Sequence, residues 1–187
     1  AGTTTTFSST FSGVDITGTT TANMTFNGAV TSTGNIAAGV GSTTAFNSTV
    51  SAVNLSNSGA MTLKGAVTLS GTMTTVSGST ITLGSAFKAG SAAAITAAST
   101  SVGTLDQTVN AVTVNVNNQF TTGTVVLFKN TAAALDSDDL ASFNVTDTAI
   151  VDYTAALSST AKAIEITANK RTTAGIATYL GMSTAQS

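Results

Sequence analysis

Three six-residue blocks decide the fold: Phe26-Asn-Gly-Ala-Val-Thr31, Phe46-Asn-Ser-Thr-Val-Ser51 and Leu63-Lys-Gly-Ala-Val-Thr68. Two more blocks, Phe7-Ser-Ser-Thr-Phe-Ser12 and Leu83-Gly-Ser-Ala-Phe-Lys88, share their pattern. In each, a large apolar residue is followed by any residue, two small residues, an apolar residue and a polar residue. The blocks begin 19, 20, 17 and 20 residues apart. A pattern that recurs at such a period predicts stacked structural repeats.

Each unit of the repeat contains two apolar elements. In the first, Met24, Phe26, Gly28 and Val30 alternate with polar or small residues, which is typical of a strand with one buried face. The second element is centred on an apolar residue in each unit: Ile16, Ile36, Leu55, Met73 and Ile95. Two short strands per unit of about 19 residues predict one rung of a β-solenoid, whose neighbouring rungs bury one another's apolar faces. The alternative is a β-sandwich, because regularly spaced turns fit that fold too.

The inward apolar positions of both elements form the expected repeat core. They are Phe26, Val30, Phe46, Val50, Leu63, Val67, Leu83, Phe87, Ile16, Ile36, Leu55, Met73 and Ile95. In the first three units Asp15, Asn35 and Asn54 stand just before the second element. Such side chains are either ordinary turn residues or a stacked ladder that hydrogen-bonds along the array.

The chain divides into residues 1–105, the solenoid repeat region, and residues 106–187, a β-rich segment that caps the array or takes part in assembly. Only three of the 14 charged residues, Asp15, Lys64 and Lys88, fall in the first part. In the second part we expect strands around 112–116, 124–129 and 163–168. One short helix is expected from Asp136 or Ser137 to about Phe143, and another over about 170–182. The fold class is therefore all-β with one or two short helices.

Composition excludes several kinds of chemistry. The 187 residues include no cysteine, histidine or proline, and the net charge is −2. Histidine-dependent triads and thiol chemistry are therefore impossible, no cofactor is expected, and a chain without a basic surface is a poor partner for nucleic acid. No apolar run is long enough to span a membrane as a helix. The absence of proline fits an unbroken strand ladder.

Few residues suggest a chemical site. The one acidic cluster, Asp136, Asp138 and Asp139, is a weak candidate for calcium binding, since the glycine and closing glutamate of a calcium loop are absent. The other interpretation is a helix start. A lysine–asparagine isopeptide bond needs a buried lysine and a nearby acid, for which Lys129, Asn144 and Glu165 are the candidates. We expect no catalytic residues and no enzyme.

The repeat contains segments of the type Thr-Phe-Asn-Gly-Ala-Val. It is followed by two further segments, Ala141-Ser-Phe-Asn-Val-Thr-Asp147 and Ile164-Glu-Ile-Thr-Ala-Asn-Lys-Arg171. In these segments the chain resembles the passenger regions of bacterial autotransporter surface proteins, especially rickettsial surface-layer-type proteins. The resemblance implies a β-helical rod displayed outside a bacterial cell for adhesion or surface coating. One departure from that family is that we recognise no translocator barrel in these residues, so we expect a processed passenger, a fragment, or a relative that assembles on its own.

These patterns favour a secreted structural protein, located outside the cell or on its surface, that forms a fibre or coat. The alternative is an adhesin rod that binds a host or abiotic surface. The chain starts with Ala1-Gly2 rather than methionine, which favours cleavage by a signal peptidase over a trimmed sequence. An uncharged first strand, Thr5–Ser12, with inward positions Thr5, Phe7, Ser9 and Phe11, is the expected assembly edge. Another copy's strand would pair with it and produce head-to-tail polymers.

Overall fold

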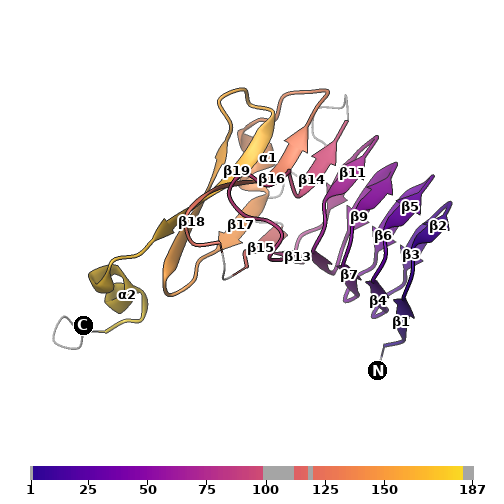
Figure 1. Ribbon diagram of the computed structural model, residues 1–187, viewed down its shortest axis with the longest axis horizontal. Helices are drawn as coiled ribbons and strands as arrows, with labels where there is room; N and C mark the ends of the chain where they lie inside the picture. Colours follow the sequence, from indigo (N-terminus) through magenta and orange to yellow (C-terminus); the bar gives the residue numbers. More distant parts are fainter. Residues whose placement is uncertain (1, 99–111, 118–119, 183–187) are drawn as a thin grey trace.

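The protein is a β-solenoid in which the chain winds through three stacked sheets (Figure 1). The structure is a computed structural model that describes residues 2–98, 112–117 and 120–182. Each complete rung contributes one strand to each of the sheets A, B and C, and the next rung adds its strands beside them. The predicted β-solenoid is confirmed, and the antiparallel sandwich is wrong, since neighbouring rungs pair in parallel.

Sheet A is entirely parallel and runs the full length of the array. Its seven strands, in spatial order, are β1 (Thr4–Phe7), β4 (Asn23–Phe26), β7 (Thr43–Phe46), β10 (Ala60–Leu63), β13 (Ser79–Leu83), β15 (Val112–Asn115) and β17 (Phe143–Thr146). The register aligns Phe7 with Phe26, Phe46, Leu63 and Leu83. The spacing of 19, 20, 17 and 20 residues seen in the sequence is thus the number of residues between equivalent positions in neighbouring rungs.

Sheet B begins as a parallel stack and ends with two antiparallel strands. Its order is β2 (Phe11–Gly13), β5 (Val30–Ser32), β8 (Val50–Ala52), β11 (Val67–Leu69), β14 (Ile95–Ala97), β16 (Gly123–Asn130), β19 (Ala163–Lys170) and β18 (Val151–Leu157). The strands β16, β19 and β18 are longer than the others and pair antiparallel. The solenoid pattern therefore gives way to a meander at this end.

Sheet C is the shortest, and two helices lie beyond the repeats. The sheet contains β3 (Ile16–Gly18), β6 (Asn35–Ala38), β9 (Asn54–Asn57) and β12 (Met73–Thr75). The helices are α1 (Ser137–Ala141) and α2 (Thr173–Tyr179), close to the expected positions. Figure 1 shows α2 at the opposite end of the molecule from β1. None of the helices in the described residues is long and apolar enough to cross a membrane.

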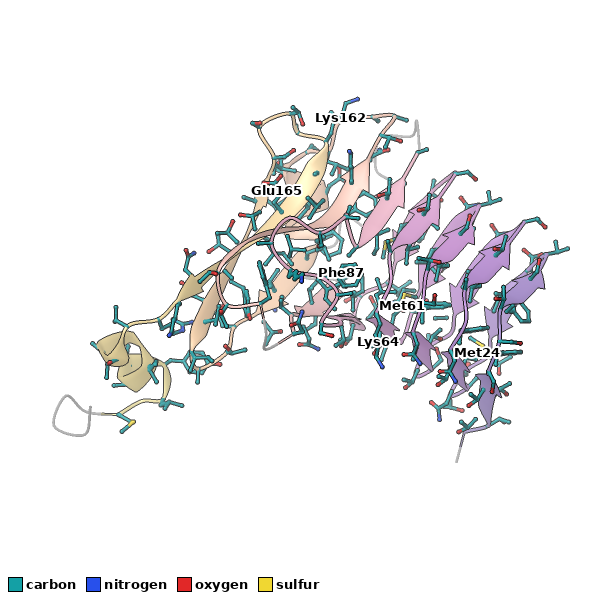
Figure 2. The ribbon with its side chains drawn as sticks, in the orientation of Figure 1. Met24, Met61, Lys64, Phe87, Lys162 and Glu165 are labelled. Carbon is teal, nitrogen blue, oxygen red and sulfur yellow. The ribbon has the colours of Figure 1, made fainter. Side chains whose placement is uncertain are left out.

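The interior is a set of apolar columns along the rod. All thirteen residues of the expected repeat core are buried. The rings of Phe26 and Phe46 stack with centroids 5.2 Å apart and planes 15° apart, and Leu63 and Leu83 extend this column. Figure 2 shows Met24 and Met61 among the neighbouring rungs and Lys64 pointing away from the rod. Contact between like residues in successive rungs buries surface that no single rung could bury alone.

Two details of the expected repeat are wrong. A complete rung has three strands rather than two, because each six-residue block bends at its small residues and continues in a different sheet. At Gly28, a Cβ atom would lie 2.4 Å from the carbonyl carbon of Ser9, so this corner is too crowded for a side chain. In the last unit, Ile95 stacks on Val67 in sheet B, and Phe87 lies in the loop between β13 and β14. Among its described residues that unit has no strand in sheet C, and four rungs have a strand in all three sheets.

The expected boundary between residues 105 and 106 lies outside the described residues. On either side of it the strands belong to the same sheets, because β15 pairs with β13 and β16 pairs with β14, both in parallel. Residues 112–117 and 120–182 thus extend the core of the repeat region and add to it the antiparallel strands and the helices.

Candidate functional site

The first rung presents three unpaired strand edges. Among the described residues, β1, β2 and β3 are the outermost strands of sheets A, B and C, and each pairs only with the strand of the second rung. Phe7 and Phe11 are half-buried, and their rings meet edge-on with centroids 4.9 Å apart. Phe7 also stacks on Phe26 at 4.7 Å. The aromatic column therefore reaches the end of the rod and leaves part of its last two rings uncovered.

The expected single edge strand over Thr5–Ser12 is wrong in one respect. The chain bends at Ser9, so Phe7 lies in sheet A and Phe11 lies in sheet B. Thr5 and Ser9 are exposed. The edge is consequently not one strand but the rim of a whole rung, which a partner would have to match in more than one sheet.

At the other end, sheet A stops at β17. Among the described residues β17 pairs with β15 alone, and its register places Val145 beside Val114. Just after β17, Asp147 Oδ2 accepts a hydrogen bond from Arg171 Nη2 at 2.7 Å. Arg171 also lies 4.9 Å from the ring centre of Tyr179. These contacts fasten α2 beside the end of sheet A, and no motif in the sequence pointed to them.

Aspartate and asparagine side chains form ladders along two corners of the rod. The backbone N–H of Asn35 donates to Asp15 Oδ1 at 2.7 Å, and Asn54 Nδ2 donates to Asn35 Oδ1 at 2.8 Å. The ladder interpretation of these three residues is confirmed. A second ladder, in which Asn47 Nδ2 donates to Asn27 Oδ1 at 2.7 Å, was not expected. Its signal was present in the sequence, since both asparagines follow the phenylalanine of their block.

The outer face of sheet A is a regular grid of short, uncharged side chains, which we name the threonine face. Each strand contributes two outward residues, and parallel pairing places them in two columns. The first column is Thr4, Asn23, Thr43, Ala60, Thr80, Thr113 and Asn144; the second is Thr6, Thr25, Ala45, Thr62, Thr82, Asn115 and Thr146. Nine of the fourteen are threonine and none is charged.

A hollow interrupts the corner between sheets C and A. Two residues join β9 to β10, whereas four residues join β6 to β7. The shorter corner leaves a hollow of about 340 Å³ beside the exposed side chains of Val40 and Val76. Gly59 makes this corner possible, because a Cβ atom there would lie 2.5 Å from the carbonyl oxygen of Ser42.

The acidic cluster forms a helix start. Asp136 is the N-cap of α1, and its Oδ1 accepts from the backbone N–H groups of Asp138 and Asp139 at 3.0 Å. Asp139 Oδ2 accepts in return from the Asp136 N–H, which completes a capping box. Burial raises the pKa of the Asp139 carboxyl, and the neighbouring charges of Asp136 and Asp138 add to the increase. Within the described residues, no group of three or more acidic side chains has a geometry that could hold a metal ion.

The three candidates for an isopeptide bond are not brought together. Lys129 is exposed on β16 in sheet B, and Asn144 is exposed on β17 in sheet A. Glu165, on β19, is half-buried and pairs with Val126 rather than with Lys129. Lys129 thus lacks the burial that this reaction needs.

Within the part of the chain that the structure describes, the candidate surfaces are the outermost strand edges at the two ends of the rod and the threonine face. No protein-family model, curated protein or solved structure matches the chain. The resemblance to autotransporter passenger regions consequently rests on the quoted sequence segments alone.

Proposed function

We propose that the chain is a non-enzymatic, extracellular structural protein whose copies assemble head to tail into a surface fibre or coat. The observation that supports this function is the uncovered rim of the first rung. The strands of this rim, β1, β2 and β3, contain no charged residue, and their unpaired backbone N–H and C=O groups are a template for another strand. The half-buried rings of Phe7 and Phe11 add apolar surface that a partner would bury.

The partner surface in this proposal is the free edge of β17. All seven strands of sheet A run in the same direction, so β1 of the next copy continues the sheet if it pairs with β17 in parallel. Extending the observed columns places Thr5 of that copy beside Val145, and Thr6 beside Thr146. A contact between two different surfaces propagates into a filament unless its rotation happens to close a ring.

Cysteine cross-linking tests this arrangement, because the chain contains no cysteine of its own. We would introduce Thr6→Cys and Thr146→Cys together. Adjacent strands place Cα atoms about 4.8 Å apart, within the range that a disulfide spans. Within one chain the two positions lie six strand spacings apart, about 29 Å, so only neighbouring copies can be bridged.

The expected result is a ladder of covalent oligomers on a non-reducing gel and filaments in electron micrographs. The matched control carries Thr6→Cys with Thr68→Cys, which lies on sheet B, and should give no ladder. Filaments without a Thr6–Thr146 ladder would contradict the pairing of β1 with β17. A chain that remains monomeric at high concentration, with neither filaments nor a ladder, would refute head-to-tail assembly.

A second candidate function is an adhesin rod, and the threonine face favours it. An uncharged and regularly spaced surface suits contact with an extended neutral solid better than binding of one small ligand, which normally requires a concave pocket. The two functions use different surfaces, since one uses the ends of the rod and the other uses its side.

A further inference from the structure

The threonine face combines fixed spacing with mostly threonine side chains: each strand carries threonine at one outward position or more, and β1 and β13 carry it at both. Neighbouring strands lie about 4.8 Å apart, and outward residues on one strand are two residues, or about 6.6 Å, apart. The grid therefore repeats along two nearly perpendicular directions over seven strands. Threonine is β-branched, so its χ1 rotation is restricted and its hydroxyl and methyl groups are held in place by the backbone. Little side-chain entropy remains to be lost when such a face meets another ordered surface.

The absence of charge limits the partners that this face can recognise. None of its fourteen outward residues is charged. Phosphate backbones and anionic lipid surfaces attract lysine and arginine, neither of which is present in the grid. A matching partner is thus neutral, and it presents hydrogen-bonding groups at regular intervals.

The size of the face argues against a second copy as the partner. Seven strands of about four residues cover roughly 29 Å by 13 Å, or about 400 Å². A stable, specific protein interface buries about 800 Å² on each partner. The face is only about half that size, so it is too small for a stable side-by-side dimer. A rigid crystalline lattice needs less area, because it loses almost no conformational entropy on contact.

We propose that the threonine face binds the surface of ice crystals. This inference rests on the proposed adhesin function and identifies ice as the solid that the rod binds. It does not depend on head-to-tail assembly. The oxygen atoms of hexagonal ice repeat along two perpendicular directions at spacings close to those of the grid. The threonine hydroxyls then occupy positions that continue the lattice, while the methyl groups exclude mobile water between them. Many weak contacts made at once by a rigid body give strong overall attachment.

Sheets B and C provide an internal control. Most of their parallel strands in the repeat have three residues, with one outward side chain at the centre, so they form a single column rather than a grid. Thr68 is the central, exposed residue of β11, and Thr62 is an outward residue of β10 in the same rung. Thr62→Lys and Thr68→Lys therefore make the same chemical change on two different faces.

The test measures thermal hysteresis, the gap between the melting and growth temperatures of an ice crystal, and the share of protein taken up by growing ice. The wild-type chain should show both effects. Thr62→Lys should reduce them several-fold, because a long charged side chain holds the lattice away from the face. Thr68→Lys should leave them unchanged, and Thr62→Val, which keeps the methyl groups, should retain most of the activity.

Circular dichroism establishes that each variant is folded, and Thr43→Lys, on the same face, replaces Thr62→Lys if the latter unfolds. Absence of hysteresis in the wild type would overturn the proposal. So would an equal loss of hysteresis in Thr68→Lys and in the variant of the threonine face, whether Thr62→Lys or Thr43→Lys. Uptake by microcrystalline cellulose but not by ice would overturn it as well. Cysteine cross-linking measures assembly separately, so a failure at ice is distinguishable from a failure to polymerise.

Discussion

Truncating one ring in the aromatic column tests whether stacking between rungs stabilises the protein. Phe46 is completely buried, and its ring stacks on that of Phe26 at 5.2 Å. Leu63 lies beside it in the next rung. Phe46→Ala removes the ring from both contacts and leaves a cavity that flanking strands cannot close without breaking their register. Such truncations cost about 3–5 kcal/mol.

This loss is a large part of the stability of an ordinary domain, which is about 5–15 kcal/mol. For a chain of this length each kcal/mol lowers the melting temperature by about 2–4 °C, so a fall of about 6–20 °C is expected. Thermal unfolding followed by far-ultraviolet circular dichroism measures it. The control is Ser51→Ala, an exposed position in the same rung, which should change stability by no more than about 0.5 kcal/mol. Equal melting temperatures for the two variants would refute the conclusion that the contacts of Phe46 with neighbouring rungs stabilise the fold.

Two further predictions concern single positions. Gly59→Ala should destabilise the protein by about 1–3 kcal/mol, because its Cβ would press against backbone oxygen atoms. Gly175→Ala in α2 is the control and should not lower the melting temperature. Equal melting temperatures for the two variants would show that the corner at Gly59 adjusts to the added methyl group. Asp139→Asn should gain stability relative to the wild type as the pH rises, because a carboxyl whose folded pKa is raised above 3.8 stabilises the fold below that pH and loses this contribution as the pH rises through the folded pKa. A difference in melting temperature that is independent of pH would contradict this reasoning.

The solenoid was predictable because one residue class recurs at one inward position. Phe7, Phe26, Phe46, Leu63 and Leu83 are aligned in the structure as they are in the sequence. The corner between the first two strands of each rung was not predictable from the alternation, because Gly28 falls on the inward phase of a continuous strand. Its tight contact with Ser9 comes from the neighbouring rung, and local periodicity carries no information about that distance.

The candidate sites were predictable to different degrees. The Asp136 helix cap follows from local sequence, and a capping box is recognisable within four residues. The contact of Arg171 with Asp147 joins residues 24 positions apart through the antiparallel strands β18 and β19. The threonine face was visible only after the register was known, because a grid depends on how strands align and not only on what each contains.

The uniform rise of the rungs has a consequence for how the chain reaches its fold. Paired strands of the first four rungs are only 17–20 residues apart in sequence. Relative to 187 residues, that separation corresponds to a contact order of about 0.1, which is in the range of helical bundles rather than β-sandwiches. The antiparallel end is different, since Gly123 pairs with Ala168. We therefore expect the first rungs to zip together one after another, in nascent-chain order, and the closing meander to form later and more slowly.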